Sequence, residues 1–256
     1  MKKILFTILF ASSLFSQDLK NIHCDKLIKN DILNICYNYS AKSANYVEYT
    51  VKKDSVNSVN IKKRPRFYRD KHIPKLFSVS PSDYIYATDS KTEYLTFDRS
   101  HLAPDADFDY SRKSLLKVYT MANIVAMRDR VNRYTWENLE ERERELAAIS
   151  DTKVISGAIY EDKDLYLVKK NISEIIKIKQ HKLKRELSLF EKIKLRKKYK
   201  KYNKTLKRKH ILIPTKLYKI ISLDKHKECY LLDNIKDKIL SKNCDFVWSY
   251  IEQHTN

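Results

Sequence analysis

Asp98, Arg99 and His101 lie within four residues of one another in the sequence FDRSH, and their side chains could together act on a phosphate ester. A neutral imidazole can take a proton from water near pH 7, and a guanidinium can hold phosphate oxygens through two parallel hydrogen bonds. A single histidine in a sequence is more often structural, so FDRSH alone does not assign a reaction.

A second group of chemically useful residues lies downstream, where Asn132, Trp136, Glu140 and Arg144 recur at four-residue steps. Residues 133–150 are rich in Glu, Arg, Leu and Ala and lack Gly and Pro, so we predict a helix that carries the four residues on one stripe. A packing helix would place aliphatic residues there. A solvated face would explain Glu140 and Arg144 but not the aligned Asn132 and Trp136.

The two groups together meet the needs of phosphodiester hydrolysis, which requires an activated water and stabilisation of the charge on the phosphate and the leaving oxygen. His101 would deprotonate the water, while Arg99 and Arg144 would hold the phosphate. Mg²⁺ or Mn²⁺ would suit a site with oxygen ligands, bound directly by Asn132 and through water by Glu140.

The order and spacing of these residues resemble the DNA/RNA non-specific endonucleases, a branch of the ββα-metal (His-Me finger) nucleases. The resemblance rests on FDRSHLAPDADF, YTMANI and VNRYTWENLEERER, in which His101 and Asn132 are 31 positions apart. It covers roughly residues 45 to 160 and resumes weakly at HILIPTKLYKII. It implies an α+β fold, with a ββα-metal core and a mixed or antiparallel sheet, and cleavage that leaves 5′-phosphate and 3′-hydroxyl ends.

The resemblance also implies a role for each site residue. His101 would be the general base, Asn132 the one direct protein ligand of a hydrated Mg²⁺, and Glu140 a ligand through metal-bound water. Arg99 and Arg144 would contact phosphate.

Three further residues take roles from the same resemblance. Asn123 matches a substrate-positioning asparagine nine residues before the metal ligand, and Asp98 is expected to hold the turn. A substrate-binding arginine is expected in the upstream basic loop, where Arg64 is preferred to Arg66.

The chain departs from the family pattern at two places. Ser100 replaces the glycine of the motif, which costs backbone freedom if that position needs a positive φ. Ala126 and Met127 replace the usual Pro-Gln, which removes an amide side chain near the site. A degenerate copy that binds without cutting is therefore the alternative to an active nuclease.

The first 16 residues predict a secretory signal peptide, because two lysines precede the apolar run ILFTILFA and small residues follow it. An apolar run of this length is too short to span a bilayer. We therefore expect a single nuclease domain over 17–256, with its core at about 45–160 and 210–235, located in the periplasm or the medium.

An exported chain meets an oxidising environment, so its four cysteines predict two disulfides. Nearest neighbours would pair Cys24 with Cys36 and Cys229 with Cys244, although four cysteines allow three connectivities. Buried free thiols are the alternative.

Strands are predicted where aromatic and β-branched residues concentrate. The ranges are 45–51, 93–101, 153–160 and 210–223. Gly157 is the only glycine in the chain, so the turns must rely on Asn, Asp, Ser and Pro.

The net charge of +20 favours a polyanionic partner, and most of it is concentrated in one segment. Residues 169–209 hold 18 Lys and Arg and three Glu, without Gly or Pro. We predict one long helix or a helical hairpin inserted between strands, with apolar residues at helical spacing. Those residues are Ile172, Ile176, Leu183, Leu187 and Phe190.

This basic insertion has three possible roles. It could be an ordinary solvated face, or it could grip the phosphate backbone while Tyr199 and Tyr202 stack on bases. It could also adhere to an anionic membrane surface.

These features together predict a secreted, Mg-dependent, sequence-nonspecific endonuclease that cleaves DNA and RNA with a histidine base. The alternative is a non-catalytic secreted protein that binds nucleic acid or a membrane surface and keeps a vestigial nuclease site. A structural protein of the cell envelope is a third possibility. The sequence identifies no inhibitor protein.

Overall fold

The computed structural model describes residues 19–85, 87–92, 95–169, 172–203 and 210–255. The predicted signal peptide lies outside the described residues.

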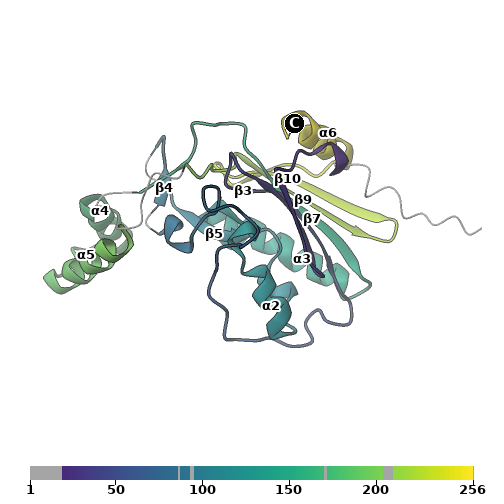
Figure 1. The fold of residues 1–256 in the computed structure, drawn as a ribbon, viewed down its shortest axis with the longest axis horizontal. Helices are drawn as coiled ribbons and strands as arrows, with labels where there is room; N and C mark the ends of the chain where they lie inside the picture. Colours follow the sequence, from purple (N-terminus) through teal and green to yellow (C-terminus); the bar gives the residue numbers. More distant parts are fainter. Residues whose placement is uncertain (1–18, 86, 93–94, 170–171, 204–209, 256) are drawn as a thin grey trace, which may run out of the picture.

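A seven-stranded antiparallel sheet forms the centre of the molecule (Figure 1), with the strand order β1-β2-β3-β7-β9-β10-β11. Its strands are β1 (Lys26–Lys29), β2 (Leu33–Asn38), β3 (Ser43–Val51), β7 (Thr152–Ile159), β9 (Lys216–Leu223), β10 (His226–Asp233) and β11 (Lys238–Ser241). The strands predicted at 45–51 and 153–160 are confirmed. Of 210–223, only Lys216–Leu223 forms a strand, because Pro214 has no N–H to donate to a ladder.

The two faces of this sheet carry separate apolar cores, since successive side chains of a strand point to opposite sides. On one face Leu217 and Ile221 of β9 pack with α3 (Glu137–Ala147). On the other face Tyr218 and Ile220 pack with Val247 and Ile251 of α6 (Cys244–His254). The helices α3 and α6 therefore cover opposite faces of the sheet (Figure 1).

A smaller ββα unit lies beside the sheet. The strands β5 (Phe97–His101) and β6 (Ile124–Arg128) pair in antiparallel fashion. After β6 the chain makes a π-helical turn, η5 (Val131–Trp136), and continues directly into α3. The expected α+β class is confirmed, and the strand that carries FDRSH lies where it was predicted.

The remaining elements connect and cover these two parts. They are η1 (Leu19–Asn21), η2 (Pro81–Tyr84), β4 (Ala87–Asp89), η3 (Asp105–Asp107), α2 (Arg112–Val118), η4 (Met121–Asn123), β8 (Leu167–Lys169), α4 (Ile172–Leu183) and α5 (Leu189–Asn203). The helices in the described part of the chain are too short or too polar to cross a membrane.

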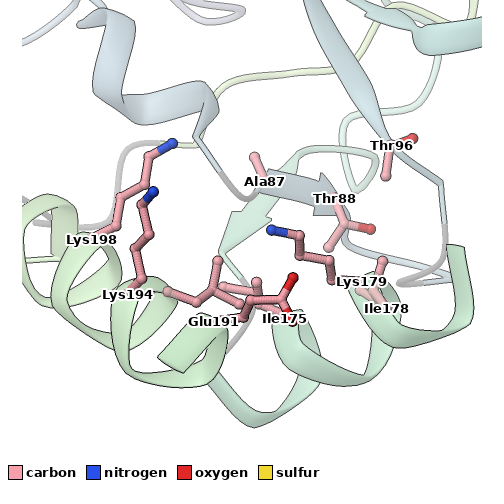
Figure 2. Close-up of a pocket in the computed structure, with 10 residues that line it drawn as sticks. Ala87, Thr88, Thr96, Ile175, Ile178, Lys179, Glu191, Lys194 and Lys198 are labelled. Atoms are coloured by element: carbon pink, nitrogen blue, oxygen red, sulfur yellow. The ribbon is translucent and has the colours of Figure 1, made fainter. Parts of the chain in front are cut away.

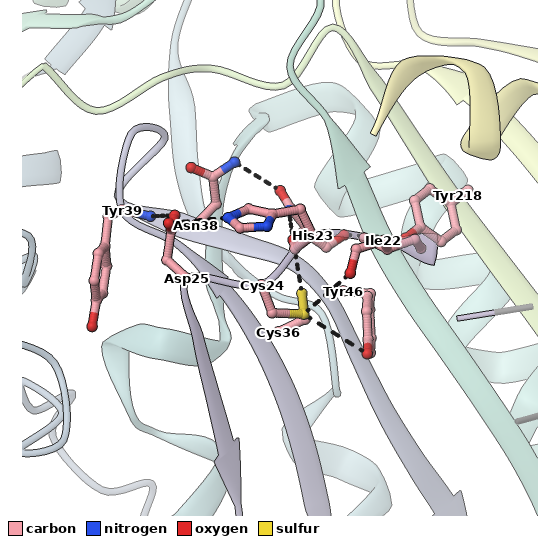
Figure 3. Close-up of a disulfide and its surroundings, with 10 residues drawn as sticks. Ile22, His23, Cys24, Asp25, Cys36, Asn38, Tyr39, Tyr46 and Tyr218 are labelled. Carbon is pink, nitrogen blue, oxygen red and sulfur yellow. Dashed lines mark hydrogen bonds and ion pairs between the residues drawn. A yellow bond between two sulfur atoms is a disulfide. The ribbon is translucent and has the colours of Figure 1, made fainter. Parts of the chain in front are cut away.

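Both disulfides form between nearest neighbours, as the simplest pairing predicted. Cys24 lies just before β1 and bonds to Cys36 of β2, which is buried near Tyr46 (Figure 3). Cys229 of β10 bonds to Cys244 at the start of α6. The second disulfide therefore fixes α6 to the face of the sheet that it covers.

The basic insertion folds as a helical hairpin of α4 and α5, which lies at the far end of the molecule from the central sheet (Figure 1). Ile176 and Leu187 are buried in a small core of its own, as their spacing predicted. Leu183 and Phe190, which have the same helical spacing, are 44% and 74% exposed and lie outside this core. The chain turns at Lys184, whose φ of +51° lies in the left-handed region, and the helical phase is interrupted there.

The only glycine lies inside β7, where no larger residue would fit. A Cβ atom on Gly157 would come within 2.0 Å of Cζ of Tyr218 on the neighbouring strand. The described residues with positive φ all carry side chains, and they are Lys42, Asn57, Lys184, Asp224 and Asp237.

Candidate active site

His101 lies at the end of β5 among aromatic rings. The ring of Phe67 is 5.2 Å from the imidazole and that of Tyr119 is 5.0 Å away, measured between centroids. Burial lowers the pKa of His101 to about 4, although the carboxylate of Asp105 opposes the shift. The imidazole is therefore neutral at pH 7 and can accept a proton.

The Nε2 atom of His101 is buried and has no hydrogen-bond partner among the described residues. Buried polar atoms are almost always paired, so an unpaired one requires an explanation. A water molecule or substrate atom that binds during the reaction would supply the missing partner.

Asn132, in η5, is held from both ends of its amide. The hydroxyl of Ser100 donates to Oδ1 at 2.5 Å, and Nδ2 donates to Asp98 Oδ2 at 3.1 Å. Asn132 therefore lies against β5, beside the residue that precedes His101. Its Oδ1 keeps a second lone pair for another ligand.

Asp98 connects β5 to the start of the helix. Besides Asn132, its carboxylate accepts hydrogen bonds from Nε and Nη2 of Arg133, at 2.8 and 2.9 Å. These contacts agree with the expectation that Asp98 holds the turn.

Two arginines lie near His101. The guanidinium of Arg99 lies 4.9 Å from the ring centroid of Phe67, and Arg64 pairs with Asp105 at 3.3 Å and with Asp109 at 3.0 Å. Both arginines act to lower the pKa of His101, as neighbouring positive charges do. This proximity supports Arg64 as the arginine of the basic loop that faces the site.

Glu140 and Arg144 extend from α3 toward the same region. Burial raises the pKa of Glu140 to about 8, with Lys219 acting in the opposite direction, and the carboxylate has no hydrogen-bond or ion-pair partner among the described residues. Arg144 Nη1 donates to Asp107 at 3.2 Å. The charge of Asp105 affects the pKa of both His101 and Glu140, so these two side chains share one neighbourhood.

Trp136 does not face the site, although it was predicted on one helical stripe with Asn132, Glu140 and Arg144. This side chain is fully buried in the core, where Nζ of Lys219 lies 4.7 Å from the ring centroid. The prediction assumed α-helical geometry, whereas Val131–Trp136 forms a π-helical turn with more residues per turn. Asn132 is therefore rotated relative to Glu140, toward β5.

Asn123 is not available to a substrate in this structure. It is fully buried, and its Nδ2 donates to the carbonyl oxygens of Ala103 and Val118 while its Oδ1 accepts from the N–H of Ala103. All of its polar groups are thus used by the backbone. In this structure Asn123 braces the loop that follows His101.

The residues that replace the family's Pro-Gln are buried in the strand that pairs with β5. Ala126 and Met127 are fully buried in β6, and the sulfur of Met127 lies 3.4 Å from the hydroxyl oxygen of Ser100. The substitution therefore changes the packing behind Ser100.

A buried polar network beneath α3 was missed by the sequence analysis. Lys219 donates to Glu143 at 2.6 Å, and Tyr49 donates to the same carboxylate at 2.9 Å, with all three side chains buried. Burial, together with the neighbouring Glu143 carboxylate, raises the pKa of Asp107 well above its ordinary value. The signal in the sequence was Lys219 itself, which occupies an inward position between aliphatic residues of β9.

The oxygen atoms of Asn132 and Glu140 suit a hydrated Mg²⁺ or Mn²⁺ better than an ion that is enclosed by protein ligands alone. The described residues contain no cluster of three or more His, Cys, Asp or Glu side chains that could hold an ion. The fixed amide oxygen of Asn132 and the unpaired carboxylate of Glu140 could hold an ion that keeps most of its water ligands, as Mg²⁺ does.

Comparisons with known proteins place the chain in a family. The family model for DNA/RNA non-specific endonucleases matches residues 11–251. A nuclease from Nostoc sp. is 28% identical over 122 residues, which is 48% of this chain and 41% of that protein. The mitochondrial nuclease EXOG of Xenopus laevis is 27% identical over 114 residues, which is 44% of this chain and 29% of that protein.

A solved structure shares the fold. It is the crystal structure of the EndoG/EndoGI complex, which matches with a TM-score of 0.57 and 19% identity over 89% of this chain and 81% of that one. The match to the family model extends over nearly the whole chain and includes both the β5–β6 hairpin and α3. The chain belongs to the family of DNA/RNA non-specific endonucleases.

Proposed function

We propose that the protein is an exported, metal-dependent and sequence-nonspecific endonuclease that hydrolyses phosphodiester bonds of DNA and RNA. The observation that carries the proposal is the neutral His101, whose Nε2 atom is buried and unpaired among the described residues, beside an asparagine fixed in orientation by Ser100 and Asp98.

In the proposed reaction, Nε2 of His101 accepts a proton from a water molecule as the water oxygen attacks phosphorus. Arg99 and Arg64 stand beside His101 and stabilise the negative phosphoryl oxygens. Arg144 contributes a third positive charge from α3, on the side of Asp107.

A divalent cation would be held directly by Asn132 and through water by Glu140. When bound, it would neutralise charge on the phosphate and on the leaving oxygen. An adjacent cation would also favour the ionised form of Glu140, whose pKa burial otherwise raises.

Two observations support an extracytoplasmic location. Two disulfides are formed in the described part of the chain, and disulfides persist in oxidising compartments. The N-terminal residues have the composition of a signal peptide. Export would also keep a nonspecific nuclease away from the genome of its own cell.

A plasmid-nicking assay tests the proposal. The wild-type protein is incubated with Mg²⁺, with Mn²⁺ and with EDTA, and it is compared with His101→Ala and with His72→Ala, a half-exposed histidine that pairs with Asp70. We expect cation-dependent cleavage of DNA and RNA by the wild type and by His72→Ala, and a loss of about 10²- to 10⁴-fold in His101→Ala. Cleavage that survives both EDTA and His101→Ala would refute the proposal. Nucleic-acid binding without any cleavage would favour the vestigial-site alternative, and vesicle binding without DNA binding would favour an envelope protein.

A further inference from the structure

A pocket of about 500 Å³ lies between the basic hairpin and the small β4–β8 sheet, outside the candidate active site. Figure 2 shows that Lys179 reaches toward it from α4, and that Lys194 and Lys198 border it from α5. Its opposite wall is formed by Thr88 of β4 and by Thr96. The volume is sufficient for a nucleotide-sized group.

The pocket has a positive electrostatic character. Lys179 and Lys194 are exposed and have no ion-pair partner among the described residues. The one carboxylate in the lining, Glu191, is already paired with Arg185 at 2.8 Å and accepts a hydrogen bond from the N–H of Ser188. Lys179 and Lys194 are therefore not neutralised from within the pocket, which favours an anionic ligand.

A polar atom in the wall also lacks a partner. Thr88 is only 2% exposed, and its Oγ1 atom has no hydrogen bond to any described residue. An unpaired buried hydroxyl carries a cost in free energy that a ligand or a bound water would remove. The wall opposite the lysines thus presents an unused hydrogen-bonding group.

One residue of the pocket lining, Thr96, belongs to the chain segment that leads into the strand with the candidate catalytic residues. Thr96 bridges to Thr88 and directly precedes β5, which ends at His101. His101 lies five positions after Thr96 along the strand, a distance of about 16 Å at roughly 3.3 Å per residue. Since each strand of DNA has one phosphate per roughly 3.4 Å of helix axis, this corresponds to about five nucleotides.

We propose that this pocket binds a backbone phosphate of the substrate, about five nucleotides from the bond that is cleaved. The inference rests on the proposed nuclease function and adds a second point of attachment to it. Lysines that contact phosphate carry no base information, so such a grip is compatible with cleavage at any sequence.

The shape of the hairpin favours nucleic acid over a membrane surface. A helix that lies on a membrane has one apolar face and one polar face. In α5, basic residues at consecutive positions 196, 197 and 198 point to different sides, and its buried Leu195 packs inside the hairpin core. Apolar residues exposed on α5 are Leu189, Phe190 and Ile193, all in its first turn or just beyond it.

Two triple variants of the full-length protein test the proposal. The pocket variant carries Lys179→Ala, Lys194→Ala and Lys198→Ala. The control variant carries Lys177→Ala, Lys197→Ala and Lys200→Ala, which removes the same charge from the same two helices outside the pocket lining. Cleavage of oligonucleotides of about 30 and about 4 nucleotides is measured at several salt concentrations.

On the long substrate, we expect the pocket variant to show a KM at least about tenfold higher than the wild type, with kcat unchanged. The dependence of log(1/KM) on log salt concentration should become less steep by roughly one unit, since the contact with one phosphate is lost. The control variant should differ little from the wild type. On the short substrate, which cannot span from the active site to the pocket, all three proteins should have similar KM values.

Equal KM values for the pocket and control variants on the long substrate would overturn the inference while leaving the nuclease assignment intact. Absence of cleavage by the wild type would instead refute the proposed function on which the inference rests. Binding to vesicles of anionic phospholipid is measured in parallel. If the pocket variant loses vesicle binding and its KM for DNA is unchanged, the pocket is a membrane contact and not a phosphate-binding site.

Discussion

The hydroxyl of Ser100 donates a hydrogen bond to the amide oxygen of Asn132, so the residue that replaces the glycine of the family motif contacts the expected metal ligand. Ser100 is buried in β5, within the antiparallel pair with β6. Its backbone therefore needs no positive φ, and the substitution adds a hydroxyl at a place where glycine has no side chain.

We predict that Ser100 orients Asn132 for cation binding. Ser100→Ala should raise the Mg²⁺ concentration needed for half-maximal cleavage by about 10-fold or more, since residues that orient metal ligands have effects of this size. Ser100→Thr keeps the hydroxyl and should retain most of the cation affinity. An unchanged Mg²⁺ dependence in Ser100→Ala would show that the hydrogen bond that Asn132 donates to Asp98 suffices to orient it.

The pH dependence of cleavage should reflect the lowered pKa of His101. The imidazole acts as a base only when it is neutral, and burial keeps it neutral down to a pKa of about 4. We expect kcat/KM to remain nearly constant from pH 7 to pH 5 and to fall at lower pH. A fall in kcat/KM centred near pH 6.5, with the fold intact by circular dichroism, would contradict this environment.

Stability should also depend on pH through His101. Because its pKa in the folded state lies below the unfolded value of 6.5, the unfolded chain binds the extra proton first as the pH decreases. The contribution of His101 to the free energy of unfolding should therefore decline from about pH 6.5 toward pH 4. In His101→Gln, urea denaturation should show a smaller decline over this interval.

The buried pair of Lys219 and Glu143 supplies a prediction about stability. Lys219→Met leaves the Glu143 carboxylate buried without its cation, and we expect a loss of about 3 to 5 kcal/mol in the free energy of unfolding. The double variant Lys219→Met with Glu143→Leu removes both charges and should be more stable than Lys219→Met alone. Chemical denaturation of the two variants measures the difference, and equal stabilities would show that the charge of Glu143 carries no penalty once Lys219 is gone.

The disulfide between Cys229 and Cys244 should stabilise the fold by about 3 kcal/mol, because it closes a loop of 15 residues. Replacing both cysteines by serine should lower the Tm, and the amides of α6 should exchange with solvent sooner than those of β7. Replacing Cys24 and Cys36 instead should leave exchange in α6 unchanged. Faster exchange throughout the sheet in the first variant would show that α6 is not a separate unit.

Local sequence patterns predicted the parts of the site that lie on single elements. FDRSH was predicted at the end of a strand and lies there, and the helix with Glu140 and Arg144 was also found. Trp136 was misplaced because spacing alone does not distinguish a π-helical turn from an α-helical one. The contacts of Asn123 with the backbone of Ala103, 20 residues earlier in the chain, could not be predicted, because only the folded structure brings these residues together.

The buried network could not be predicted from local patterns. Lys219 and Glu143 are 76 residues apart, and they meet because β9 lies beside β7 under α3. A lysine between aliphatic residues indicated something unusual at this position, but the identity of its partner depends on the register of the sheet.

The near absence of glycine leaves this protein open to thermostabilisation at its turns. Lys42 and Lys184 adopt left-handed backbone conformations, which cost a residue other than glycine about 1 to 2 kcal/mol. This cost is larger than the free-energy cost of the conformational entropy that glycine would lose on folding. Glycine at either position, remote from His101 in the sequence, would relieve that strain. Glycine, which the chain uses only once, is thus the first substitution to introduce at these turns for higher thermal stability.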